Sequence, residues 1–121
     1  MTNSNNIDME AVVHEQYRLW NGEKRDELLS YMKSLGPNGF TVEFVGGPVQ
    51  DGVEAIEATW DKYGSKTKLE IVLLIAKGNE VAVTVNNNVH TENGVITIPS
   101  IDFYKVEDGK LTIRYFHHEP S

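Results

Sequence analysis

The sequence predicts an α+β domain in which a curved antiparallel sheet is covered by helices on one side. In the first half of the chain, hydrophobic residues recur at helical spacing, and in the second half they alternate as they do in strands. Short turn sequences separate the strand segments: Gly78-Asn79, Asn93-Gly94 and Asp108-Gly109. Strands joined by such short turns run antiparallel, because a parallel pair needs a long crossover.

Three helices are expected, each bounded by a capping or breaking residue. Asp8 is suited to cap the first helix, and Gly64 is suited to end the third. The expected helices cover about 9–21, 24–35 and 52–63. A short strand over 40–45 lies between the second and third helices, with Gly46-Gly47-Pro48 as the turn that ends it. Four longer strands follow, over about 68–76, 81–90, 95–106 and 111–118.

Composition limits the classes of function. The chain has 121 residues, 40% of them hydrophobic, so we expect one domain over 9–121 after a flexible polar lead over 1–8. It has no cysteine, and therefore neither a disulfide nor a thiolate zinc site. A net charge of −7 without a basic stripe disfavours nucleic-acid binding. With no apolar run long enough for a membrane span and no apolar signal segment, a cytoplasmic location is the default expectation.

Motifs for phosphate loops, hydrolase nucleophiles and zinc helices are missing from the sequence. We therefore expect neither a metal site nor a nucleotide, haem or flavin cofactor.

Three segments carry a resemblance to a known family: AVVHEQYRLWNGEKRDEL, DGVEAIEATWDKY and DFYKVEDGKLTIRYF. In order and spacing they resemble the nuclear transport factor 2-like superfamily, in its SnoaL-like and ketosteroid-isomerase-like branch, over about 9–118. The resemblance implies a cone-shaped fold in which the sheet and three helices enclose a pocket for a small hydrophobic molecule. It also implies catalysis without a cofactor and a homodimer formed sheet to sheet.

Strand alternation predicts which side chains face the pocket. The inward sets are expected to be Val83, Val85, Asn87 and Val89; Ile98, Ser100, Asp102 and Tyr104; and Arg114, Phe116 and His118. The opposite face is expected to hold Asn86, Asn88, His90, Ile101, Phe103, Ile113, Tyr115 and His117. Because this second row is also partly apolar, a second subunit is expected to cover it.

Asp102 is the first catalytic candidate. It lies between Ile101 and Phe103 in a strongly β segment, where burial would raise the pKa of its carboxyl and suit it to proton transfer. The segment 99–103 resembles the Pro-Ile-Asp-x-Phe sequence around the oxyanion-hole Asp of ketosteroid isomerases, with one residue inserted. The alternative is a structural salt bridge between Asp102 and Arg114.

Three further polar residues are candidates for assisting roles. Arg114 and His118 could assist proton transfer, although a surface arginine and a solvated terminal histidine are the simpler interpretations. Gln16 aligns with the tyrosine of the ketosteroid isomerases and Tyr17 follows it, so Tyr17 is a candidate donor or else a core tyrosine. Phe44 occupies the position of their general base, while the neighbouring Glu43 is expected to face the other way.

Together these residues lead to two hypotheses of different classes. One is a cofactor-independent isomerase, dehydratase or cyclase acting by proton transfer on a steroid-, terpenoid- or polyketide-like molecule. The other is a non-catalytic binding or dimerisation module. An epoxide hydrolase of the limonene type is a further alternative, although it would need a second pocket Asp. The expected substrate-binding residues are Gln16, Trp20, Phe44, Trp60, Val85, Asn87, Ser100 and Phe116, with Tyr31 and Tyr63 as further aromatic candidates.

Overall fold

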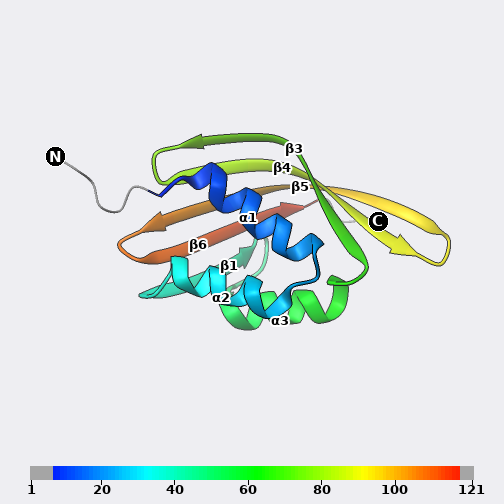
Figure 1. The fold of residues 1–121 in the computed structure, drawn as a ribbon, viewed down its shortest axis with the longest axis horizontal. Coiled ribbons are helices and arrows are strands. Elements are labelled where there is room, and N and C mark those ends of the chain that lie inside the picture. Colours follow the sequence, from blue (N-terminus) through cyan, green and yellow to red (C-terminus); the bar gives the residue numbers. More distant parts are fainter. Residues whose placement is uncertain (1–6, 118–121) are drawn as a thin grey trace.

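The computed structural model describes residues 7–117 as three helices and six strands (Figure 1). The helices are α1 (Met9–Asn21), α2 (Arg25–Leu35) and α3 (Gly52–Tyr63). The strands are β1 (Gly39–Phe44), β2 (Val49–Asp51), β3 (Thr67–Lys77), β4 (Glu80–Thr91), β5 (Gly94–Glu107) and β6 (Lys110–His117). The α+β class, the three helices and the curved sheet are thus confirmed.

The sheet is mixed, with the strand order β2-β1-β6-β5-β4-β3. All neighbouring strands are antiparallel except β1 and β6, which run parallel. The expectation of a wholly antiparallel sheet was wrong at this one pairing. Residues 45–109 separate the two strands, so no short turn fixes their relative direction. The three-residue strand β2 was also not predicted, because it is too short to show any periodicity.

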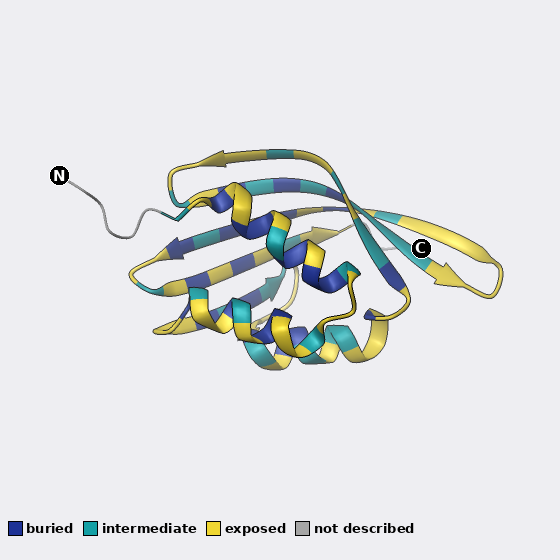
Figure 2. Cartoon of the chain, viewed as in Figure 1, coloured by how far each residue is buried: buried dark blue, intermediate teal, exposed yellow. Residues whose placement is uncertain are grey.

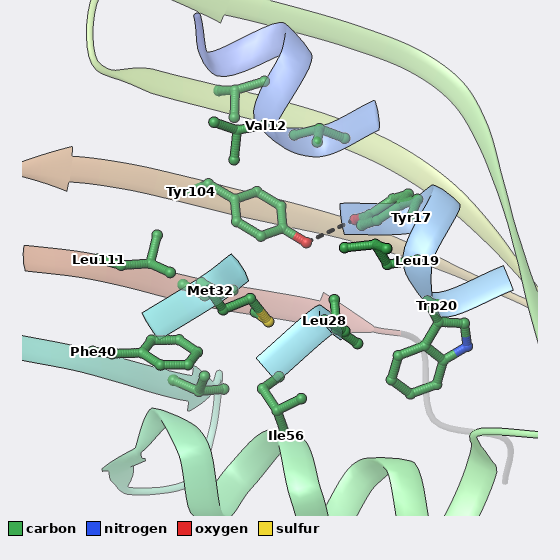
Figure 3. Packing of buried hydrophobic residues seen from close by; sticks show 14 of the residues in the cluster. Val12, Tyr17, Leu19, Trp20, Leu28, Met32, Phe40, Ile56, Tyr104 and Leu111 are labelled. Atoms are coloured by element: carbon green, nitrogen blue, oxygen red, sulfur yellow. Dashed lines mark hydrogen bonds between the residues drawn. The ribbon is translucent and has the colours of Figure 1, made fainter. Parts of the chain in front are cut away.

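The helices cover one face of the sheet, and the hydrophobic core fills the space between them (Figures 1 and 2). Each layer contributes fully buried side chains, including Val13 from α1, Met32 from α2, and Val42 and Ile113 from the sheet. Figure 3 shows Tyr104 of β5 directed toward Tyr17 of α1 in the midst of this packing. None of the described helices is both long enough and apolar enough to cross a membrane.

Side-chain caps begin two of the three helices. As predicted, Asp8 caps α1 by accepting a hydrogen bond from the backbone N–H of Ala11 at 3.1 Å. Asp51 caps α3 in the same way through the N–H of Glu54 at 3.0 Å. These caps satisfy backbone donors that have no partner within the helix.

The turn between β5 and β6 sets the register of the strands that flank it. Asp108 and Gly109 both have positive φ, at 54° and 73°, as a type I′ turn requires. Glu107 then pairs with Lys110, and each even-numbered residue of β5 lies opposite an odd-numbered residue of β6.

The turn between β4 and β5 differs from the prediction by one position. Thr91 pairs with Gly94, so the two turn residues are Glu92 and Asn93 rather than Asn93 and Gly94. Gly94 still supplies a positive φ, of 119°. The parity of the pairing between the two strands is unchanged by this shift.

Gly52, at the start of α3, lies where the helix backbone packs closely on β1. A Cβ at this position would lie 2.3 Å from the ring of Phe40, which is itself buried. We expect Gly52→Ala to lower the free energy of unfolding by about 1–3 kcal/mol, because the ring must move in a filled core. Urea unfolding measures this loss. Gly47→Ala is the control, since its Cβ would make only ordinary contact, and equal losses in both variants would contradict the prediction.

Candidate active site

A cavity of about 460 Å³ lies between the three helices and the inner face of the sheet. Large apolar side chains form most of its wall: Trp20, Leu28, Met32, Phe44, Ile56 and Leu69. Polar side chains from β4, β5 and α1 gather in one part of the wall. The cavity therefore combines an apolar chamber with a localised group of hydrogen-bonding side chains, as small-molecule sites usually do.

Asp102 lies at the centre of this polar part. The alternation of β5 turns Ser100, Asp102 and Tyr104 toward the cavity, and Asp102 is only 5% exposed. The Tyr17 hydroxyl donates a hydrogen bond to Oδ2 of Asp102, and the Ser100 hydroxyl donates to Oδ1 at 3.0 Å. Each carboxyl oxygen of Asp102 thus has its own donor.

Each hydroxyl group has one proton and can donate only one hydrogen bond, so the hydrogen bonds around ionised Asp102 can run in only one direction. Because Tyr17 gives its proton to Asp102, its oxygen must accept from the Tyr104 hydroxyl, 2.9 Å away. The oxygen of Tyr104 in turn accepts from Nε2 of Gln16 at 3.0 Å. On the other side, Nδ2 of Asn87 donates to Ser100 at 2.9 Å. Two chains of donors therefore converge on Asp102.

The pKa of Asp102 reflects this setting. Burial raises the pKa from 3.8 to about 6, while the hydrogen bonds from Tyr17 and Ser100 act in the opposite direction. Burial also raises the pKa values of Tyr17, Tyr104 and Tyr115. The three phenols therefore keep their protons at neutral pH, whereas Asp102 titrates just below it.

Two buried polar atoms in the described part of the chain have no hydrogen-bond partner: Oε1 of Gln16 and Oγ1 of Thr67. Both residues lie in the cavity wall. Buried polar atoms are nearly always paired, so such unpaired atoms require a partner such as water or a ligand. Their place in the wall is consistent with a cavity that holds polar groups of a bound molecule.

The prediction of which β6 side chains face the cavity was wrong. Asp102 lies opposite Tyr115, and Ser100 lies opposite His117, so the odd-numbered residues of β6 share the cavity face. Ile113 is fully buried, and Tyr115 and His117 line the cavity, although all three were expected on the outer face. Arg114 and Phe116 were expected inside, but they point outward and are exposed. The two-residue turn at Asp108-Gly109 causes this, because it pairs even with odd positions.

Arg114 therefore forms no salt bridge with Asp102, and that structural interpretation was also wrong. Its Nε donates to Oε1 of Glu43 on the neighbouring strand β1 at 3.0 Å. Glu43 faces away from the cavity, as expected, and Phe44 faces it. Among the described residues, Asp102 is the only carboxylate in the cavity wall.

The other predicted residues divide into three groups. Gln16, Trp20, Phe44, Asn87 and Ser100 line the cavity, as does Tyr17. Trp60 and Val85 do not: Trp60 packs edge-on against Trp20 at 4.9 Å between ring centroids, and Val85 is buried in the core. His118 lies outside the described residues.

Sequence reasoning missed several residues of the cavity wall, among them Lys62, Thr67, Tyr115 and His117. The register implied by the Asp108-Gly109 turn could have identified the two on β6. Lys62 and Thr67 gave no signal, because their positions depend on how α3 and the start of β3 pack. Within residues 7–117 no group of three or more His, Asp or Glu side chains is placed to hold a metal ion.

Because the pKa of Asp102 is raised, we expect the free energy of unfolding to depend on pH. A carboxyl that binds its proton more tightly in the folded state adds stability at low pH and loses it as the pH rises from about 4 to 6. A pKa raised from 3.8 to about 6 corresponds to about 3 kcal/mol. Urea unfolding of wild type and Asp102→Asn across this range should show the loss only in the wild type. Parallel pH profiles would contradict it.

Comparison with known proteins identifies the family. The model of the SnoaL-like domain family matches residues 8–113 of the chain. No curated protein matches the chain in sequence.

Solved structures show the same fold at low sequence identity. An NTF2-like protein of unknown function from Cytophaga hutchinsonii aligns with a TM-score of 0.70 and 20% identity over 98% of this chain and 95% of its own. SalBIII, an epoxide hydrolase/cyclase-like enzyme of pyran ring formation in salinomycin, aligns with a TM-score of 0.73 and 22% identity over 90% and 89%. A candidate SnoaL-like polyketide cyclase from Jannaschia sp. CCS1 aligns with a TM-score of 0.73 and 14% identity over 97% and 90%. The chain belongs to the SnoaL-like domain family and has the NTF2-like fold.

Proposed function

We propose that this protein is a cofactor-independent enzyme that moves a proton on a small hydrophobic molecule held in the cavity. One observation carries the proposal: Asp102 is a buried carboxyl with a pKa of about 6 in the wall of an otherwise apolar cavity. A proton-transfer group works best when its pKa lies near the working pH. Asp102 meets this condition because burial raises its pKa toward neutrality.

Asp102 would act first as a base. At neutral pH it is mostly ionised and can take a proton from a carbon next to a carbonyl group of the ligand. The electron pair left on that carbon moves toward the carbonyl oxygen, which gains negative charge. Once Asp102 is protonated it no longer needs the hydrogen bond from Tyr17, so Tyr17 can donate to this oxygen. Return of the proton to another atom of the ligand completes an isomerisation.

Loss of a leaving group, or attack within the ligand, would give a dehydratase or a cyclase from the same first step. Several of the structural neighbours are named for cyclase chemistry, which supports this range of reactions. An epoxide hydrolase of the limonene type has less support. It needs an Arg and a second Asp beside the first, and among the described residues the cavity wall contains neither.

One observation favours a non-catalytic binding module instead. Both oxygens of Asp102 already have hydrogen-bond donors, as they would in a purely structural site. The two functions differ in what removal of the carboxylate does. A binding module would keep its ligand without any chemistry, whereas an enzyme would lose the chemistry.

We also propose that the protein forms a homodimer through the outer face of the sheet. This face carries exposed large apolar side chains in two adjacent rows: Leu73, Ile101 and Phe116 in one, and Ile75 and Phe103 in the other. Thr84 and Ala82 of β4 lie within these rows, and the second row ends at the ion pair of Arg114 and Glu43. Charged or polar rows flank this band, with Lys105 on one side and Glu70 and Asn86 on the other. An apolar band with a polar border is typical of a protein interface, and a second copy offers the same band.

The catalytic prediction is tested by hydrogen exchange into ketones and enones. A thermal-shift screen first finds compounds that bind, because a ligand at 100 times its dissociation constant adds about 2.7 kcal/mol of stability. Proton NMR in D₂O then follows exchange at the carbon next to the carbonyl. We expect Asp102→Asn to slow exchange by at least about 100-fold and Tyr17→Phe by about 100-fold.

The control is Asp61→Asn, which removes an exposed carboxylate outside the cavity wall and should leave exchange unchanged. If ligands bind but undergo no exchange, or if Asp102→Asn exchanges as fast as wild type, the enzymatic proposal is wrong. Binding without exchange would point to the binding module.

The dimer is tested by size-exclusion chromatography with light scattering. We expect wild type to elute as a dimer, and Phe103→Lys to elute as a monomer because it places a charge within the apolar band. Thr112→Lys changes an exposed residue of the same face outside the band and should remain dimeric. If the wild type is a monomer at a concentration on the order of tens of micromolar, the proposed interface is refuted.

A further inference from the structure

Lys62 is the one lysine or arginine in the cavity wall of the described chain. It lies in the last turn of α3, and its side chain is exposed, so it stands at the opening of the cavity. Its ammonium group lies 5.3 Å from the centre of the Tyr63 ring, which also lines the cavity. A positive charge is thus held at the entrance of a mainly apolar chamber.

This charge has no carboxylate partner among the described residues. Six other cations of the chain form ion pairs there: Arg18, Lys24, Arg25, Lys68, Lys105 and Arg114. The residues three and four positions before Lys62 on the helix are Thr59 and Ala58, and the corresponding positions after it, Ser65 and Lys66, lie beyond the end of α3. None of them is an acid, so the pairing typical of helix surfaces is impossible for Lys62.

Three other polar side chains of the same cavity wall are exposed: Gln50, Tyr63 and His117. Of these, Tyr63 lies beside Lys62. Asp102 is buried, and its pKa is set by burial, Tyr17 and Ser100 without a contribution from any cation. The cavity therefore has a positive group at its entrance and a separate acid inside.

We propose that the ligand of this cavity is an amphipathic acid: an apolar molecule with a carboxylate that pairs with Lys62 at the entrance. The inference rests on the proposed function in that it concerns the same cavity. The apolar body occupies the chamber lined by Trp20, Phe44 and Ile56, and the reacting end reaches Asp102. The carboxylate stays in contact with water at the opening, which spares most of the free energy of removing it from water.

The net charge of −7 gives this lysine a specific role. The field of the whole protein repels an acid, so an acidic ligand needs a local cation at the entrance. A neutral ligand would gain nothing from that cation. Lys62 therefore acts as a specificity determinant that distinguishes acids from their neutral analogues.

Decanoate and its neutral analogue decanamide are the probes, because a flexible chain adapts to a cavity of any shape. Binding is followed by isothermal titration calorimetry with wild type, Lys62→Gln and Lys66→Gln. Lys66→Gln removes the same charge from an exposed residue outside the cavity wall. We expect wild type to prefer the acid by about three- to fivefold, the range of a partly exposed ion pair. The preference should vanish in Lys62→Gln, persist in Lys66→Gln and weaken in about 1 M salt.

Equal affinity of wild type for the two probes, or an equal loss of preference in both variants, would overturn the inference. Failure of decanoate to bind would overturn it as well, since an apolar cavity with an unpaired cation at its entrance should accept this acid. None of these outcomes changes the expected effect of Asp102→Asn on hydrogen exchange. Failure of the acid preference is therefore distinguishable from failure of the proposed function.

Discussion

The two-residue turn at Asp108-Gly109 is the constraint on which the rest of the site depends. Its positive φ angles give a tight turn that pairs even residues of β5 with odd residues of β6. Since paired residues share a face, Asp102 meets Tyr115 inside the sheet, and Arg114 is turned to the outside. A turn longer by one residue would reverse every side chain of β6. It would place a guanidinium beside Asp102, which would lower the pKa of that carboxyl. This turn thus decides which side chains surround Asp102, and with them the pKa on which the proposed chemistry depends.

Burial of Asp102 without a cation makes the carboxylate costly, and the surrounding donors offset only part of that cost. Tyr17 and Ser100 stabilise the ionised form, and Tyr104 and Asn87 hold those two donors in place. The remaining imbalance is visible as a pKa of about 6. An ion pair with Arg114 would have lowered the pKa of Asp102 and made it a weaker base, so the absence of a cation beside Asp102 suits the proposed proton transfer.

Much of this arrangement could be predicted from sequence, where local rules determine it. Helix caps, turn residues and strand alternation located the elements, and the alternation of β5 correctly placed Ser100 and Asp102 on the cavity face. The prediction for Arg114 was wrong because strand alternation alone does not say which side chains of β6 face the cavity. The register set by the Asp108-Gly109 turn does. The parallel pairing of β1 with β6, and the entry of Lys62 into the cavity wall, are products of tertiary packing. No sequence pattern within these segments predicts either feature, because both depend on the position of an element distant in the sequence.

The direction of the hydrogen bonds links the two protonation states of Asp102 to the ligand. In the ionised state each hydroxyl proton is committed toward the carboxylate, and the chain ends at Gln16, whose Oε1 has no partner. When Asp102 gains a proton, that commitment ends, and the Tyr17 proton becomes free for another acceptor in the cavity. In the proposed reaction, the new acceptor is the ligand oxygen that gains charge from the same proton transfer. Tyr17 would then be free to donate to it only after Asp102 has accepted the proton. Such timing would favour the charged intermediate over the bound ligand, as the proposed catalysis requires and simple binding does not.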